Sequence, residues 1–227
     1  MSKVQQFYDK SAEYEWIRLE RHKMEFAVTM RAVQEYLPKP PAAVLDIGGG
    51  PGRYSIALAK LGYKVTLLDL TPNLLAFARV KAAEEGVALE DIICRNALDL
   101  ALLPNAQFDA VLLMGPLYHL LEEPERKQAI AEARRVLKPG GVLLASFICR
   151  YASFRDAAKG YPEWLLEHPE GAERIFKSGV HVAGPDSGFT DAYFIHPTDV
   201  TPLMESCGFT TLDLIGVEAL VDHNEEK

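Results

Sequence analysis

Two acidic residues and a cluster of glycines are the residues of this sequence best suited to holding a ligand. Asp46 follows the apolar residues at 43 to 45, and the glycines come directly after it: Gly48, Gly49, Gly50 and Gly52. Without a Cβ, the backbone at these positions can take positive φ and a ligand can lie directly against it. The stretch AVLDIGGGPGR at 43 to 53 therefore predicts a buried strand that turns into a helix beside a bound ligand.

The charge of Asp46 distinguishes between the two ligand classes that use such a loop. The dinucleotide fingerprint G-x-G-x-x-G brings a pyrophosphate to a helix N-terminus, where backbone N–H groups stabilise anions. Here the third glycine comes one residue early, and the carboxylate of Asp46 would repel a pyrophosphate. The same carboxylate suits a ligand with an ammonium group and no phosphate, such as S-adenosylmethionine. A nicotinamide dinucleotide, and with it a dehydrogenase, stays open as the alternative.

A second acid stands where a ribose contact is expected. Asp69 lies 23 residues after Asp46 and ends the apolar run KVTLLD at 64 to 69. An acidic residue about 20 residues beyond the glycine loop accepts hydrogen bonds from ribose hydroxyls. We therefore expect Asp46 and Asp69 to line one cleft.

Five segments in order resemble the class I S-adenosylmethionine-dependent methyltransferases. VLDIGGGPGRYSIALAKLGYKVTLLDL is similar to motifs I and II of that family. The likeness continues through RNALDL at 95 to 100, FDAVLLMGPLYHL at 108 to 120 and EARRVLKPGGVLLASF at 132 to 147. It covers roughly residues 42 to 148 and implies a Rossmann-like fold that binds S-adenosylmethionine.

The resemblance also implies a role for each matching residue on the cofactor side. Asp46 would accept from the methionyl ammonium, directly or through water, beside the backbone of Gly48 to Gly52. Asp69 would take both ribose hydroxyls. The residues expected around the adenine are Leu70, Asn96, Ala97 and Leu98. Asn96 stands where the family usually has Asp, so it can accept from the adenine amino group only as a neutral amide.

The segment MGPLYHL at 114 to 120 is expected to face the transferred methyl group. Met114 and Gly115 end the fourth strand there. The segment is not the N/D-P-P-Y/F tetrad of amino-methylating enzymes, which weighs against an adenine, cytosine or amide nitrogen as acceptor. Tyr118 can pack near the sulfonium. His119 is the candidate general base, because the ordinary pKa of histidine lies near operating pH, and we expect it with Tyr118 at the far wall of the cleft.

Residues outside this segment are weaker candidates for the acceptor pocket. They are His22, Tyr151, His181, Tyr193 and His196. The N-terminal part adds several polar or aromatic residues: Tyr8, Tyr14, Arg18, Arg21 and His22. In the family such a segment often closes over the cofactor, so one of its arginines can reach the methionyl carboxylate.

Strands that alternate with helices position these residues. Apolar runs predict strands at 43–47, 64–69, 92–95, 108–114 and 142–148, and helical spacing predicts helices at 53–61, 72–86 and 123–137. Such alternation makes a parallel sheet with right-handed crossovers. Ligands then bind beyond the carboxyl ends of the strands, where the candidate residues stand.

The two flanks of this core complete the predicted fold. A helix over 12–37 forms most of a helical N-terminal preface at 1–41, and residues 149–188 read as an inserted lid after strand five. A strand at 189–196, a helix at 198–206 with Thr198 as N-cap and a strand at 209–220 follow in the last part, 189–227. Together with the core at 42–148 they predict one α/β domain over 1–227, with a Rossmann-like, seven-stranded, mostly parallel sheet and one antiparallel strand.

Composition narrows the choice of partners. The 227 residues carry a formal net charge of −8, which disfavours nucleic acid because phosphate binding needs clustered Lys and Arg. Three well-separated cysteines, Cys94, Cys149 and Cys207, indicate neither a metal site nor a disulfide framework. The N-terminus has no apolar signal-peptide core and no stretch is long enough to span a membrane, so a cytoplasmic protein is expected.

We therefore expect transfer of a methyl group from S-adenosylmethionine to a small-molecule acceptor by in-line displacement. Two alternatives stay open. One is a methyltransferase that acts on a protein or a tRNA, and the other is a protein that binds S-adenosylmethionine or S-adenosylhomocysteine without catalysis.

Overall fold

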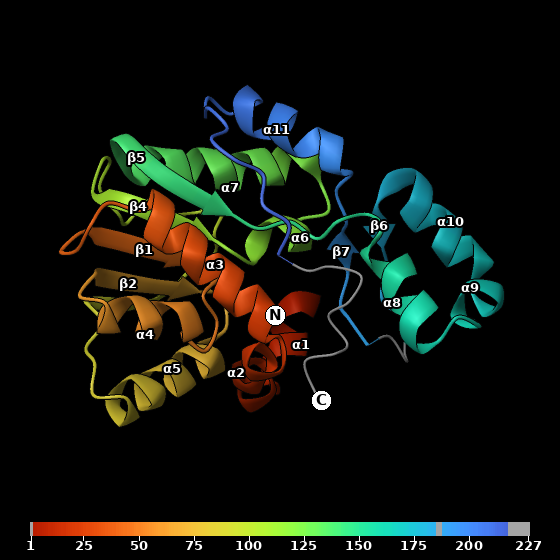
Figure 1. Ribbon diagram of the computed structural model, residues 1–227, viewed down its shortest axis with the longest axis horizontal. Coiled ribbons are helices and arrows are strands. Elements are labelled where there is room, and N and C mark those ends of the chain that lie inside the picture. The colour runs from red at the N-terminus through yellow and green to blue at the C-terminus, as the bar shows by residue number, and fades with distance from the viewer. Residues whose placement is uncertain (1, 185–187, 218–227) are drawn as a thin grey trace.

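The computed structural model describes residues 2–184 and 188–217. Its centre is a five-stranded, wholly parallel sheet in the order β3-β2-β1-β4-β5 (Figure 1). The strands are β1 (Ala43–Ile47), β2 (Lys64–Asp69), β3 (Asp91–Cys94), β4 (Phe108–Leu113) and β5 (Leu137–Ala145). The predicted Rossmann-like α/β core is confirmed for these five strands.

Helices bury both faces of the sheet. One face packs against α3 (Lys23–Tyr36), α4 (Arg53–Lys60) and α5 (Pro72–Glu84) through buried side chains that include Val33, Val44, Leu58, Val65, Leu67 and Leu75. The other face packs against α7 (Glu123–Val136) through Leu45, Leu68, Val111 and Ile130. Strands covered on both sides must be apolar almost throughout, which explains the uninterrupted apolar runs in the sequence.

The carboxyl ends of the strands meet on one side of the molecule. In Figure 1 the strand arrowheads point toward α1 (Lys3–Tyr8) and the short α6 (Pro116–His119). The glycine loop starts there, and its first N–H, from Gly48, donates to the Leu68 carbonyl at 2.7 Å. The residues predicted at strand ends therefore gather at one edge of the sheet.

The N-terminal preface is three helices and not one long helix. The predicted helix over 12–37 is interrupted at His22, whose φ of −96° and ψ of 60° separate α2 (Ala12–Arg21) from α3. An ion pair across this break, with Arg18 Nη1 2.7 Å from Glu25 Oε2, joins the two helices. The chain can thereby turn, so that α1 and α2 lie near the strand ends while α3 packs on the sheet.

Strand five begins earlier than predicted. β5 pairs at Leu137 with Phe108 and again at Val142 with Ala110, and the residues between them form an irregularity in the ladder. This irregularity occupies the residues between the helix predicted at 123–137 and the strand predicted at 142–148, and Gly140 has a φ of 76° there. The strand therefore includes a connection that the prediction left outside it.

The segment after β5 is helical, and its strands do not join the main sheet. It holds α8 (Ala152–Gly160), α9 (Trp164–Glu167) and α10 (Pro169–Ser178), which Figure 1 shows grouped beyond the strand ends. β6 (Val180–His181) pairs antiparallel with β7 (Ala192–Tyr193) as a separate ladder. The strand predicted over 189–196 is thus wrong in length, because its backbone divides its hydrogen bonds: Phe194 N donates to Gly179 and Ile195 N to Ile148.

The final part also departs from the seven-stranded prediction. The helix α11 (Pro197–Ser206) is present, but His196 and not Thr198 is its N-cap. Residues 209–217 form no strand, and 218–220 lie outside the described residues. Gly208, at a φ of 84°, turns the chain after α11, and Phe209 N bonds back to Met204. The described sheet therefore has five strands where seven were predicted.

None of the helices in the described ranges is both long enough and apolar enough to cross a membrane.

Candidate functional site

The glycine loop is shaped by close backbone approaches. Gly48, Gly50 and Gly52 have φ values of 74°, 55° and 80°. Gly49 is required for a different reason, because a Cβ there would lie 2.5 Å from both Asp46 Oδ2 and Leu67 Cδ1. At Gly50 the nearest atom to such a Cβ is 3.7 Å away. The outer surface of the loop thus has room that its inner surface lacks.

Asp46 lies beneath the inner surface of this loop and not on its open, outer side. Its side chain is fully buried, and Oδ2 accepts a 2.6 Å hydrogen bond from the Ser55 hydroxyl. Oδ1 is buried without a hydrogen-bond partner among the described residues. Burial raises the pKa of Asp46 to about 6, while the Ser55 hydroxyl opposes the shift. The carboxylate is therefore a buried charge that any nearby cation would stabilise.

Asp69 ties the end of β2 to the glycine loop. Its Oδ2 accepts from Gly50 N at 2.9 Å and its Oδ1 from Thr71 N at 2.8 Å. Burial raises the pKa of this carboxyl, and the two backbone N–H groups oppose that shift. A carboxylate has about four lone-pair sites, so two hydroxyl groups can still bind. The geometry orients Asp69 as a ready hydrogen-bond acceptor at the strand ends.

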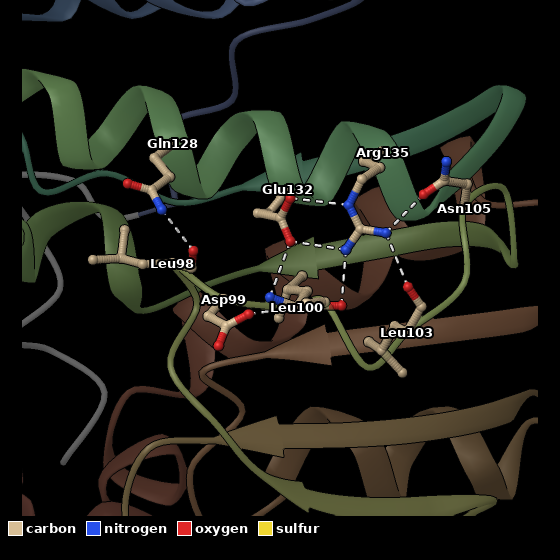
Figure 2. Close-up of polar contacts among 9 residues, drawn as sticks. Leu98, Asp99, Leu100, Leu103, Asn105, Gln128, Glu132 and Arg135 are labelled. Atoms are coloured by element: carbon tan, nitrogen blue, oxygen red, sulfur yellow. Dashed lines mark hydrogen bonds and ion pairs between the residues drawn. The ribbon is translucent and has the colours of Figure 1, made fainter.

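The segment after β3 is held from the opposite face of the sheet. Asn96 Oδ1 accepts from Leu98 N at 3.0 Å, so this carbonyl already serves a turn. Figure 2 shows Arg135 of α7 reaching the carbonyls of Leu100 and Leu103, both at 2.8–2.9 Å, while Glu132 accepts from Leu100 N. This Arg135 network fixes the segment that presents Asn96, Ala97 and Leu98.

Tyr118 and His119 stand on α6, which begins against the glycine loop. A Cβ on Gly115 would lie 3.2 Å from the Gly48 carbonyl, so α6 begins in contact with the loop. Arg126 fixes the other end of α6 by donating to the Leu120 and Leu121 carbonyls at 2.6 and 2.8 Å. Burial raises the pKa of Tyr118 to about 12 and lowers that of His119 to about 4. Both side chains are thus neutral at pH 7.

A residue of the N-terminal helix completes this wall. The hydroxyl of Tyr8, on α1, lies 3.0 Å from Nε2 of His119. Tyr8 and His119 belong to a cluster of rings whose neighbouring centroids lie 4.7 to 6.1 Å apart. Its other members are Phe7, Tyr118 and Phe189. The wall is therefore aromatic, with one imidazole at its centre.

α1 is held in place from both sides of the site. Gln5 Nε2 donates to the Leu70 carbonyl at 3.0 Å, and Lys3 pairs with Asp191 at 2.9 Å. Asn73 also donates to Asp9, just after the helix. The helix thus bridges the end of β2 and the β7 segment.

One large cavity of about 2810 Å³ collects most of the predicted residues. It exceeds the about 300–1,000 Å³ of ordinary ligand pockets because it also follows the outer edge of β5. Its walls include Gly48, Gly49, Gly50, Asp69, Leu70, Asn96, Ala97, Leu98, Met114, Gly115, Tyr118 and His119. Asp46 and Gly52 are not among them, so the expected cleft lined by both acids has only Asp69. Gly52 instead packs against Ala78 of α5.

The weaker candidates have structural partners of their own. Tyr151 and His196 bond to each other at 2.8 Å, which joins the starts of α8 and α11. His181 stacks on Phe194, and Tyr193 lies 3.7 Å beneath the Arg126 guanidinium. His22 forms the break between α2 and α3. Arg18 is paired with Glu25, and the Arg21 side chain lies outside the described residues.

Sequence reasoning missed three contributors to this site. They are Ser55, the partner of Asp46, Phe189, which packs on His119, and the direct contact of Tyr8 with His119. Tyr8 and His119 are separated by 111 positions, so no local spacing pattern joins them.

Comparison with known proteins decides the family. A model described as "Methyltransferase domain" matches residues 44–141. A ubiquinone biosynthesis O-methyltransferase from Xanthomonas axonopodis pv. citri is 32% identical over 191 residues, which cover 84% of this chain and 72% of that protein. The chain belongs to the class I S-adenosylmethionine-dependent methyltransferases. The corresponding O-methyltransferase of Xylella fastidiosa is 31% identical over 84% of this chain and 70% of its own length.

Structural similarity agrees with this family. An S-adenosylmethionine-dependent methyltransferase structure from Methanosarcina mazei has a TM-score of 0.63 and 25% identity, covering 78% of this chain and 82% of that one. The methyltransferase uses S-adenosylmethionine, as predicted, and not a nicotinamide dinucleotide. The observed loop fits this cofactor, because its outer side is open at Gly50 and a buried Asp46 oxygen has no hydrogen-bond partner among the described residues.

Proposed function

We propose that this methyltransferase transfers the methyl group of S-adenosylmethionine to a hydroxyl oxygen of a small-molecule acceptor by in-line displacement. The relatives named O-methyltransferases support oxygen as the acceptor atom. The observation that carries the proposal is the aromatic wall at α6, where His119 and Tyr8 form a neutral, proton-accepting pair.

The cofactor side would be held by the residues at the ends of β1, β2 and β3. S-adenosylmethionine supplies a methyl group already activated on a sulfonium, so the protein mainly binds and orients. Asp69 would accept the ribose hydroxyls, Leu70 and the Asn96 to Leu98 segment would flank the adenine, and the glycine loop would lie beside the methionine part. Asp46 would act from beneath the loop, stabilising the ammonium through its buried charge.

The acceptor side would lie between α6, α1 and the β7 segment. Met114 and Gly115 end β4 there, and Tyr118 would pack near the sulfonium. Holding the acceptor in near-attack geometry lowers the activation barrier by about 7–11 kcal/mol. The surrounding aromatic rings favour a small, partly apolar molecule that can reach the hydroxyl of the Tyr8–His119 pair. The helices α8 to α10 would act as a lid over this acceptor.

A macromolecular acceptor is the weaker candidate. A tRNA requires clustered positive charge, and the chain carries a net charge of −8. A protein side chain would have to reach past α1, which contacts both Leu70 and His119.

Calorimetric titration with S-adenosylmethionine, S-adenosylhomocysteine and NADH would test the cofactor side. Methyl transfer would then be measured with catechol and other small hydroxyl compounds as probes, with aniline and thiophenol as nitrogen and sulfur controls. Binding of both adenosyl ligands and methylation of hydroxyl probes alone is the expected result. Methylation of aniline or thiophenol in preference to catechol would refute oxygen as the acceptor atom.

A further inference from the structure

Neither ring nitrogen of His119 is open to a molecule in the cavity. Nε2 faces the Tyr8 hydroxyl at 3.0 Å. Nδ1 is buried and makes no hydrogen bond of ordinary geometry to the described residues. A proton that leaves an acceptor in the cavity therefore reaches this imidazole only through the oxygen of Tyr8.

Hydrogen-bond counting gives the direction of the Tyr8–His119 bond. If Tyr8 donates to Nε2, the hydrogen of His119 is on Nδ1, and that N–H alone lacks a partner. If Nε2–H donates to Tyr8, both Nδ1 and the Tyr8 hydrogen lack one, since the described residues show no other bond from this hydroxyl. The backbone of Asp191 also faces the imidazole and favours its protonated form. The first arrangement pairs the Tyr8 hydrogen within the protein, and only Nδ1 then lacks a partner of ordinary geometry.

We propose that Tyr8 is a catalytic residue that receives the proton of the acceptor hydroxyl and passes its own proton to Nε2 of His119. The inference rests on the proposed function, because it specifies how that reaction loses its proton. Tyr8 stands on α1, outside the strands and loops that make up the family motifs.

The step balances in atoms and charge. The acceptor O–H bond breaks and its proton goes to the Tyr8 oxygen, while the Tyr8 proton moves to His119 Nε2. The acceptor oxygen forms a bond to the methyl carbon as the carbon–sulfur bond breaks and its electron pair stays on sulfur. The positive charge of the sulfonium is thereby replaced by that of an imidazolium, which returns its proton to water through Tyr8.

The surroundings of Tyr8 suit a relay and not a free phenolate. Burial raises the pKa of Tyr8, and Tyr118, Glu15 and Asp69 raise it further, whereas Arg18 lowers it. A full phenolate would therefore be costly, so the hydroxyl must lose its proton only as it gains another. Gln5, on the same helix, donates to the Leu70 carbonyl at 3.0 Å, so α1 reaches the cofactor side of the cavity.

The test uses the full chain with Tyr8→Phe, which keeps the ring and removes the hydroxyl. Phe7→Leu is the matched control, because it loosens the packing of α1 on Phe189 but leaves the Tyr8 hydroxyl in place. Nitrogen NMR of protein labelled at histidine reports which nitrogen of His119 carries the hydrogen, without any ligand. Turnover is measured with S-adenosylmethionine and catechol, and binding with S-adenosylhomocysteine.

The relay predicts an unprotonated, hydrogen-bonded Nε2 in the wild type whose resonance shifts in Tyr8→Phe but not in Phe7→Leu. It also predicts a kcat about 100-fold lower for Tyr8→Phe, with unchanged S-adenosylhomocysteine binding, and a much smaller loss for Phe7→Leu. A protonated Nε2 in the wild type, or equal losses in the two variants, would overturn the relay. If the wild type methylates none of the hydroxyl probes, the proposed function itself fails, and all three proteins are equally inactive.

Discussion

The backbone N–H of Gly50 donates to Asp69 Oδ2 at 2.9 Å, so a side-chain hydrogen bond adds to the backbone bond from Gly48 to Leu68 in joining the glycine loop to the end of β2. This bond holds the carboxylate at the strand ends while leaving lone pairs for a ligand. We expect Asp69→Ala to weaken S-adenosylmethionine binding by about 2–3 kcal/mol, as loss of hydrogen bonds to a charged group does. Calorimetry measures the change.

Glu90→Gln is the control for that substitution, because it removes an exposed acid at the start of β3, far from the strand ends. It should leave the affinity unchanged. Equal affinities of wild type and Asp69→Ala would show that Asp69 does not bind the ribose.

Gly49→Ala should lower the free energy of unfolding even when no ligand is bound. The new methyl group would lie 2.5 Å from Asp46 Oδ2 and from Leu67, both fully buried. Overpacking of this kind costs about 1–3 kcal/mol of unfolding free energy, which chemical denaturation measures. Gly160→Ala is the matched control, since no atom lies within 4 Å of its Cβ position. A similar loss there would mean that the clash at Gly49 is not the cause of the destabilisation.

Arg135→Gln should release the segment shown in Figure 2. The guanidinium donates to Leu100, Leu103, Asn105 and Glu132, and the variant should lose about 1–2 kcal/mol of stability. Hydrogen exchange of the amides from 97 to 105 should accelerate. Lys127→Met removes only an exposed pair with Glu123 on the same helix and should change neither quantity noticeably. Unaltered exchange in Arg135→Gln would contradict the role of this network.

His119 should make the fold sensitive to acid. Its pKa falls from 6.5 to about 4 on folding because of burial, so the unfolded chain binds the proton first. The associated stability is fully present above pH 6.5 and is lost as the pH falls to about 4, a change of about 3 kcal/mol. Denaturation of wild type and His119→Gln across this range measures it.

The comparison between the two proteins is needed because Asp46 titrates in the same window with the opposite sign. Its pKa is raised to about 6 in the folded state, so protonation there relieves a penalty as the pH falls. This contribution is common to both proteins and cancels in the difference. Parallel curves for wild type and His119→Gln would mean that the imidazole is not buried neutral.

The sequence was sufficient to predict the core because its signals are local. Apolar runs that end at Asp46 and Asp69 identify buried parallel strands, and the parallel topology then brings their ends together. The walls of the cavity contain twelve of the predicted site residues for the same reason.

The acceptor side was less predictable because its contacts join distant segments. Tyr8 meets His119, and Arg126 stacks on Tyr193, through tertiary packing that no periodicity reports. The strand expected at 209–220 followed from β-branched and apolar residues. In the described part, however, Leu212 and Leu214 are 69% and 57% exposed, so these apolar side chains do not add to the core as those of a buried strand would.

The pairing of Lys3 with Asp191 joins residues 188 positions apart. A ribosome that has released β1 to β5 has already produced the glycine loop, Asp69 and His119, but neither Asp191 nor Phe189. Chains fold from the N-terminus as they emerge, so the nucleoside-binding half can form while translation continues. The first helix to be synthesised thus gains its last contacts only after residues 189 to 191 have emerged, and a stalled or truncated chain would contain a cofactor-binding half with an incomplete acceptor wall.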